Sequence, residues 1–302
     1  MSTSLDDSMA IQAILTAHAP LALTPGPTYA GALASDTAVY RASIQAAQQL
    51  GFIEADAQCI ANAWERQSRR TGRFDPLDWP SDPVDFGMAA VPHSCRFPPC
   101  PKELGLYAVL PTAQWVIRMA HAGVGTLQLR FKSNNSAEIA REVAAAVKGI
   151  EGTEALLFIN DHWQAAINAG AYGVHLGQED LHGADIHAIR TSGLRLGIST
   201  HGYAEMIRAD QFGPSYIAMG AVFPTTLKKM QTGPQGINRL RQYAKLLRNY
   251  PLVAIGGINQ FNLAHFLDCP IGSVGVVRAL IAADDPEKEA KEFMMALDQR
   301  RR

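Results

Sequence analysis

The sequence predicts an α/β protein whose main part is a TIM (β/α)8 barrel, preceded by a helical and proline-rich extension. Eight short apolar runs follow one another after about residue 104, and amphipathic segments with helical spacing separate them. Eight parallel strands alternating with helices close into a barrel. Several expected helices end in glycine, as helix C-termini prefer: Gly123, Gly149, Gly170 and Gly193. An open doubly wound sheet is less favoured, because no GxGxxG turn follows the first strand.

The expected strands share a run of β-branched and other apolar residues that is bounded by polar or glycine positions. They lie at 105–111, 126–132, 156–161, 173–178, 195–200, 216–223, 252–258 and 273–280. In a barrel of this kind the carboxyl ends of all eight strands converge on one mouth, where the ligands bind. The residues that end each run are therefore the candidate site.

Residues 1–103 are expected to form an N-terminal extension of unknown role, and residues 104–302 the barrel. Two helices are predicted at 36–50, capped by Asp36, and at 56–70. Prolines recur through 71–103 too often for a helix or a central strand, so this segment is interpreted as a connector. It contains His93, Cys95 and Cys100, but their spacing fits no standard zinc site.

Composition restricts the class of protein. The 302 residues carry a net charge of −1, which gives no electrostatic reason for nucleic acid or an anionic membrane to be the partner. No apolar run approaches the length of a membrane span, and the polar, acidic N-terminus is unlike a signal peptide. The four cysteines are too few for a disulfide scaffold. We expect a cytoplasmic enzyme that acts on small molecules. The sequence is also compatible with a homo-oligomer.

The second expected strand ends in a basic, polar face. Alternation along the strand places Gln128, Arg130 and Lys132 on one side, and Leu129 and Phe131 on the other. A strand inside a barrel has no solvated face until it leaves the barrel, which favours a functional role over a solvated strand end. Arginine and lysine together suit a phosphate or a diphosphate.

The third and fourth expected strands end in carboxylates. Asn160 and Asp161 close one run, and Asp180 follows the next. Neighbouring parallel strands bring such residues side by side, and Mg²⁺ is often held by one or two carboxylates together with phosphate oxygens. The alternative for Asp180 alone is that it caps the following helix. A pair on adjacent strands favours the Mg²⁺ site.

The remaining strand ends add a second anion site. Ser199 closes the fifth strand, and Thr225, Thr226 and Lys228 lie in the loop after the sixth. Barrels often bind phosphate between the loops after strands seven and eight. Gly257 and Arg278 occupy those two loops. We therefore interpret this mouth as a site for two phosphorylated substrates, one of them a diphosphate.

These motifs resemble those of the thiamine phosphate synthase family. The resemblance covers about residues 104–298 and is carried by LYAVLP, QLRFK, FINDHWQAAINAGAYGVHLGQEDL, LGISTHGYAE, YIAMGAVFPTTLKKM and VAIGGI. It implies a Mg²⁺-assisted, dissociative condensation of 4-amino-2-methyl-5-hydroxymethylpyrimidine diphosphate with 4-methyl-5-(2-phosphoethyl)thiazole. The products are thiamine phosphate and pyrophosphate.

The resemblance also implies roles for individual residues. Asp161 and Asp180 match the Mg²⁺ ligands, and Arg130, Lys132 and Lys228 would neutralise the leaving pyrophosphate. The positions that match contacts to the pyrimidine diphosphate are Gln128, Arg130, Lys132, Asn160, Ser199 and Lys228. Those that match contacts to the thiazole phosphate are Thr225, Thr226, Leu227, Gly257, Val277 and Arg278.

Three positions depart from the family pattern. Leu227 stands where the family usually has threonine, Arg278 where it usually has serine, and Pro111 where an aspartate is common. The first two departures lie on the thiazole phosphate side. Two other functions remain open at this point: a barrel that isomerises thiazole phosphate, and a non-catalytic regulator that binds ligands of the thiamine pathway.

Overall fold

The computed structural model describes residues 7–24, 34–88, 92–225 and 232–299 of the chain. They form two compact units. The first contains the described part of Met1–Ala90 together with Gly202–Gln211 and Asn238–Leu247; the second contains the rest. The boundary expected at residue 103 stays a prediction. No helix of the described residues is long and apolar enough to cross a membrane.

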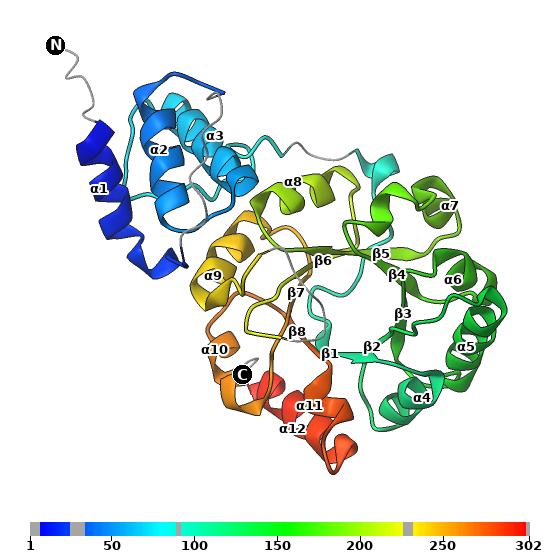
Figure 1. The fold of residues 1–302 in the computed structure, drawn as a ribbon. Coiled ribbons are helices and arrows are strands. Elements are labelled where there is room, and N and C mark those ends of the chain that lie inside the picture. Colours follow the sequence, from blue (N-terminus) through cyan, green and yellow to red (C-terminus); the bar gives the residue numbers. More distant parts are fainter. Residues whose placement is uncertain (1–6, 25–33, 89–91, 226–231, 300–302) are drawn as a thin grey trace. The chain divides into compact units, whose positions relative to one another are not determined.

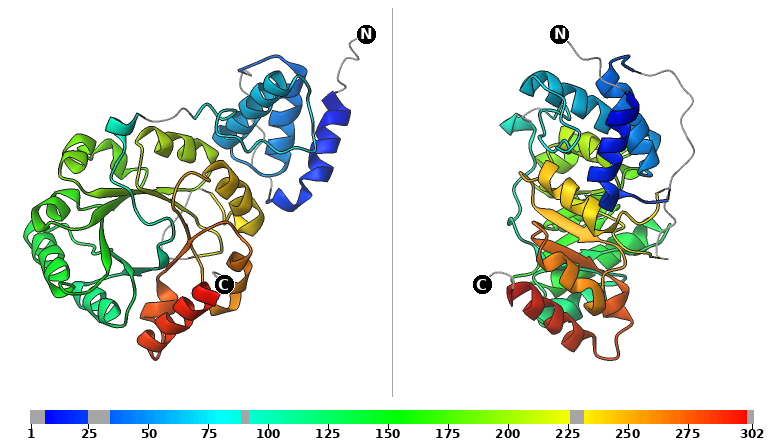
Figure 2. Two further views of the ribbon diagram at one scale, coloured as in Figure 1. Left: turned by 180° about the vertical axis from the view of Figure 1, so that it is seen from behind. Right: turned by 90° about the vertical axis from the view of Figure 1, so that its left-hand side faces the viewer.

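The second unit contains a closed barrel of eight parallel strands that follow one another in chain order (Figure 1). The strands are β1 (Gly105–Leu110), β2 (Thr126–Leu129), β3 (Leu156–Asn160), β4 (Gly173–Leu176), β5 (Arg195–Thr200), β6 (Tyr216–Met219), β7 (Leu252–Ile255) and β8 (Ser273–Val276). The ring closes where β8 pairs with β1, with Gly105 opposite Ser273. The predicted TIM barrel is confirmed, and the same ring of strands is visible from behind in Figure 2.

Helices alternate with the strands along the chain. They are α4 (Ala113–His121), α5 (Ser136–Gly149), α6 (Trp163–Ala169), α7 (Ile186–Thr191), α8 (Tyr203–Gln211), α9 (Gly236–Leu246), α10 (Gln260–Leu267), α11 (Arg278–Ile281) and α12 (Pro286–Gln299). Side chains that accept hydrogen bonds from the first turn cap several of them, as at Thr112, Asn135, Asp185 and Asn259. Short 3₁₀ turns lie at His93–Cys95 and Asp180–His182.

Seven of the eight strands end before the predicted residue, and the fifth ends as predicted, at Thr200. The fourth ends at Leu176 instead of residue 178, because Gly177 donates its N–H to the Asp180 carboxylate and the chain turns there. The sixth ends at Met219 and the eighth at Val276. Arg278 is consequently the first residue of α11 rather than the end of a strand.

The first unit contains α1 (Asp7–Ala17), a 3₁₀ turn at Ala19–Leu21, α2 (Ala38–Gln49) and α3 (Glu54–Thr71). Both predicted helices of the extension are present, but the predicted cap is wrong. Thr37, not Asp36, accepts the N–H of Tyr40 at the start of α2. The Asp36 carboxylate instead accepts a hydrogen bond from Arg41.

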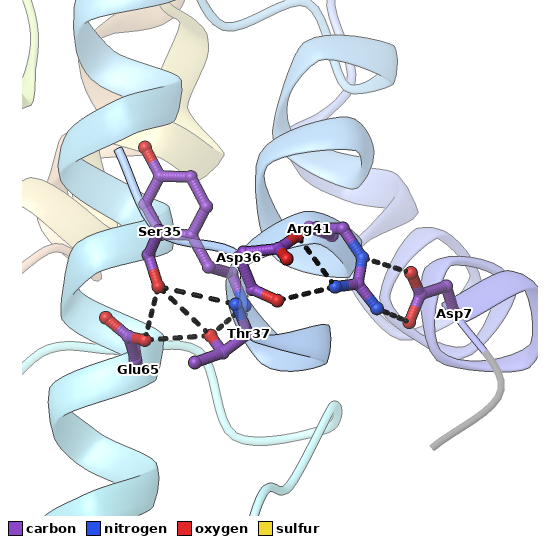
Figure 3. Close-up of polar contacts among 7 residues, drawn as sticks. Asp7, Ser35, Asp36, Thr37, Arg41 and Glu65 are labelled. Atoms are coloured by element: carbon purple, nitrogen blue, oxygen red, sulfur yellow. Dashed lines mark hydrogen bonds and ion pairs between the residues drawn. The ribbon is translucent and has the colours of Figure 1, made fainter. Parts of the chain in front are cut away.

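Polar side chains join these helices to one another (Figure 3). The Arg41 guanidinium on α2 pairs with the Asp7 carboxylate on α1 at 2.8 Å. Glu65 on α3 accepts hydrogen bonds from Ser35 at 2.7 Å and from Thr37 at 2.8 Å. Glu65 is 7% exposed, so these two donors replace the water that its carboxylate loses.

Two buried charges tie the N-terminal helices to α8 and α9 within the same unit. Asp56 on α3 accepts the N–H of Ala204, in the first turn of α8, at 2.9 Å. Arg239 on α9 donates to the carbonyl oxygens of Leu21 at 2.9 Å and Leu50 at 2.7 Å. Its guanidinium also lies 3.6 Å from the centre of the Phe52 ring. These contacts hold together segments that are far apart in the sequence, because a buried charge without a polar partner would cost free energy of folding.

The burial of Asp56 predicts a pH dependence of stability. Burial raises the pKa of Asp56 to about 6, against the partial opposition of its hydrogen bond from Ala204. Its pKa in the unfolded chain lies near 3.9. The folded state therefore binds the proton more tightly, and the free energy of unfolding falls as pH rises from about 4 to about 6. The expected contribution is about 2–3 kcal/mol, from about two pKa units.

The measurement is denaturant unfolding between pH 4 and 7 for the natural chain and for Asp56→Asn, which keeps the acceptor for Ala204 and removes the charge. The natural chain should lose stability relative to this variant across that range. Asp36→Asn, which removes an exposed charge from the same unit, is the matched control. Parallel curves for the natural chain and Asp56→Asn would contradict the assignment.

Candidate functional site

A cavity of about 750 Å³ opens at the carboxyl ends of the barrel strands. Its walls come from the strands and from the loops that follow them. The predicted site residues that line it are Gln128, Arg130, Asn160, Ser199, Thr225, Gly257, Val277 and Arg278. Thr226, Leu227 and Lys228 lie outside the described residues. The structure thus brings eight predicted residues to one mouth.

Two amides face each other on neighbouring strands. The Gln128 side chain on β2 donates to the Asn160 carbonyl oxygen on β3 at 2.7 Å. Both side chains are buried, at 3% and 7% exposure. The bond uses one donor of Gln128 and one acceptor of Asn160. The Gln128 carbonyl and the Asn160 amino group keep hydrogen-bonding capacity, which suits a heteroaromatic ring that presents both donors and acceptors.

The two predicted metal ligands lie beside each other and beside Lys132. Asp161 follows β3 with a φ of 62°, a left-handed conformation that aspartate tolerates better than most residues. Its carboxylate accepts a hydrogen bond from the Lys132 ammonium at 2.6 Å. Asp180 accepts the N–H of Gly177 at 3.1 Å. None of these three side chains is among those that line the cavity.

The pKa shifts of the two carboxyls show that they interact. Burial acts to raise the pKa of Asp161, but hydrogen bonding and attraction from Lys132 outweigh it and the pKa falls below its ordinary value. Burial raises the pKa of Asp180, and the neighbouring Asp161 carboxylate raises it further. Two such oxygens suit a hard cation. The described residues contain no group of three or more metal-ligating side chains, so further ligands would be substrate oxygens or water.

The loops after β7 and β8 form the other side of the cavity. Gly256 and Gly257 have φ values of 107° and 68°. A Cβ on Gly257 would lie 2.6 Å from the carbonyl oxygen of Pro224, so the close approach of the loops after β6 and β7 requires glycine at this position. Arg278 begins α11, directly after Val277. The site that the sequence predicted for a phosphate is therefore built from glycine backbone and one guanidinium.

Sequence reasoning missed a histidine inside the mouth. His175 lies within β4 and lines the cavity. Its ring bonds to the Ser199 hydroxyl at 2.7 Å and to the Tyr216 hydroxyl at 2.6 Å. Site residues were predicted at the ends of strands, and His175 lies three positions before the predicted end of the fourth strand at residue 178. The sequence signal for this residue was a polar side chain within an otherwise apolar strand.

A second residue of the fourth predicted strand also contacts Ser199. Gln178 closes the predicted fourth strand, and its side chain donates to the backbone carbonyl oxygen of Ser199 at 2.8 Å. The contact holds the end of β5 against the turn after β4. Ser199 is therefore positioned by two residues of the preceding βα unit, His175 through its hydroxyl and Gln178 through its backbone.

Comparisons with known proteins identify the family of the barrel. A sequence model of the family described as thiamine monophosphate synthase matches residues 106–280. A thiamine-phosphate synthase of Neisseria meningitidis serogroup B is 51% identical over 202 residues, which make up 67% of this chain and 98% of that protein. One from Serratia proteamaculans is 50% identical over 202 residues, or 67% of this chain and 95% of that protein.

A solved structure gives the same answer for the fold. A thiamine phosphate pyrophosphorylase from Pyrococcus furiosus superimposes with a TM-score of 0.58 at 26% identity. The match covers 65% of this chain and 96% of that one. The matched part corresponds in extent to the barrel that carries the carboxylate pair and the amide pair. This chain belongs to the thiamine monophosphate synthase family, and it is a transferase.

Proposed function

We propose that the barrel condenses 4-amino-2-methyl-5-hydroxymethylpyrimidine diphosphate with 4-methyl-5-(2-phosphoethyl)thiazole, to give thiamine phosphate and pyrophosphate. One observation carries the proposal: Asp161, Asp180 and Lys132 interact at the same end of the barrel as the buried Gln128–Asn160 pair. The first group suits a diphosphate with its cation, and the second suits an aminopyrimidine. A cytoplasmic location, expected from the cysteine content, is part of the same proposal.

The mechanism is dissociative. The bond between the pyrimidine methylene carbon and the diphosphate oxygen breaks, and the aminopyrimidine ring stabilises the resulting cation. The thiazole nitrogen then forms the new C–N bond, and pyrophosphate leaves with the electron pair of the broken bond. No step needs a protein nucleophile or a general base. The protein has to hold both rings in contact and to stabilise the charge that develops on the leaving group.

Each group of residues has one task in this scheme. Arg130 and Lys132, with Lys228 from outside the described residues, bind the leaving pyrophosphate. Asp161 and Asp180 would hold Mg²⁺, which would supply further positive charge to that pyrophosphate. Gln128 and Asn160 orient the pyrimidine, and the Ser199 hydroxyl contacts the same substrate.

The thiazole phosphate is proposed to bind between the loops after β6, β7 and β8. Thr225 and Gly257 line that side of the cavity, with Val277 and Arg278 at the start of α11. Thr226 and Leu227 complete the proposed set from outside the described residues. The Arg278 guanidinium replaces the hydroxyl that the family pattern usually has there, and it supplies a charge to the phosphate.

The function is tested by incubating the purified chain with both substrates and Mg²⁺. Thiamine phosphate and pyrophosphate should appear in equal amounts, and chelation of the metal should abolish both. An isomerised thiazole phosphate formed in the absence of the pyrimidine would favour a tautomerase instead. Binding of either substrate without turnover would favour a regulator.

The metal assignment predicts the effect of Asp161→Asn. Asparagine tolerates the positive φ of this position and removes only the charge. Loss of a metal ligand should reduce kcat/KM by more than about 100-fold and raise the Mg²⁺ concentration that gives half-maximal rate. Glu179→Gln, which removes the exposed carboxylate beside Asp180, is the matched control. An unchanged Mg²⁺ dependence in Asp161→Asn would remove this residue from the metal site.

The role of Arg278 is tested by Arg278→Ser, which restores the residue usual in the family. Loss of a charge-assisted contact should raise the KM for the thiazole phosphate about 10-fold, and leave the KM for the pyrimidine diphosphate near its original value. The dephosphorylated thiazole alcohol provides the control, because its weak reaction should not respond to the substitution. A lower KM for the phosphate in Arg278→Ser would mean that the arginine obstructs the site.

A further inference from the structure

We propose that Tyr107, Tyr216 and His175 form a directed chain of hydrogen bonds that holds the Ser199 hydroxyl as a donor toward the cavity. His175 is then a positioning residue, since it acts on the substrate through Ser199. The kinetic part of this inference rests on the proposed function. The protonation pattern of these four side chains does not rest on it, because that pattern is a property of the free protein.

The four side chains connect the middle of the barrel to its mouth. The hydroxyls of Tyr107 on β1 and Tyr216 on β6 lie 2.6 Å apart. The Tyr216 hydroxyl is 2.6 Å from Nδ1 of His175, and Nε2 of His175 is 2.7 Å from Oγ of Ser199. Tyr107 and Tyr216 belong to the buried cluster inside the barrel, whereas His175 and Ser199 line the cavity.

Strand register explains why these side chains meet. His175 on β4 lies opposite Gly197 on β5, and Gly197 lies opposite Tyr216 on β6. A Cβ on Gly197 would lie 2.1 Å from Cζ of Tyr216. The missing side chain on β5 therefore leaves the space in which the Tyr216 ring reaches His175. The two rings lie nearly parallel, with centroids 5.7 Å apart.

The direction of this series of hydrogen bonds follows from the Tyr107 hydroxyl. Tyr107 is 2% exposed, and within the described residues its hydroxyl has one hydrogen-bond partner, Tyr216. Burial raises the pKa of both tyrosines, so both carry their proton. If Tyr216 donated to Tyr107, the Tyr107 proton would be buried without an acceptor, which proteins avoid. Tyr107 therefore donates to Tyr216.

The remaining protons are then determined in sequence. Tyr216 has donated no proton to Tyr107, so its own proton goes to Nδ1 of His175. Neutral histidine carries one ring proton, which must be on Nε2, and this N–H donates to Oγ of Ser199. The Ser199 proton is left to point into the cavity. A serine whose proton faces the cavity suits diphosphate oxygens, which only accept.

The protonation pattern is measured by ¹⁵N–¹H correlation spectra of the histidine rings in the free protein. His175 is assigned by the signal that disappears in His175→Gln. The proposal requires the tautomer protonated at Nε2, with Nδ1 unprotonated. A ring protonated at Nδ1, alone or together with Nε2, would overturn the proposal whether or not the protein is a synthase.

A double-mutant cycle then tests that His175 acts through Ser199. His175→Leu and Ser199→Ala should each lower kcat/KM about 10-fold, and the double variant should lose no more than Ser199→Ala alone. His175→Gln, which keeps an N–H donor toward Ser199, should recover most of the loss. His121→Gln, on the exposed side of α4, is the control. Additive losses would show that His175 acts independently of Ser199, and the proposal would fail.

Discussion

The pairing of β8 with β1 is the constraint on which the site depends. Ser273 opposite Gly105 and Val276 opposite Ala108 close the sheet, and all eight strands then point the same way around one axis. Their carboxyl ends can only meet at one mouth. Residues from β2, β3 and β5 reach a single cavity for this reason, although 71 positions separate Gln128 from Ser199 in the sequence.

At the same end of the barrel, outside the cavity lining, two carboxylates lie beside a lysine. Burial raises the pKa of Asp180, repulsion from the Asp161 carboxylate raises it further, and Lys132 offsets part of that repulsion. A cation and a diphosphate would satisfy the carboxylates and the lysine separately. This arrangement is in keeping with the proposed binding of Mg²⁺ together with a diphosphate.

The first compact unit depends on buried charges that have polar partners. In its interior, Asp56 accepts the N–H of Ala204, and Arg239 binds two backbone carbonyl oxygens. Each buried charge has a partner that would be left unsatisfied without it. These interactions make α1, α2 and α3 part of one packed unit with α8 and with α9 from Asn238 onward, rather than a separate bundle.

The sequence by itself determined the class of fold and most of the mouth. Apolar runs alternating with amphipathic segments predict a (β/α)8 barrel, because each strand must be buried on both faces and each helix on one. The ends of those runs identify Gln128, Asn160 and Ser199, which the structure places in one cavity. The metal pair and the roles of individual residues stay predictions from the resemblance.

Only the tertiary structure decided where strands end and which inward side chains touch. The turn closed by Asp180 on Gly177 shortens β4, and Arg278 lies on a helix instead of a strand, because such hydrogen bonds depend on the final path of the chain. The contact of His175 with Tyr216 depends on the register that sets Gly197 between them. Register is a relation between strands, and the order of residues along each strand does not contain it.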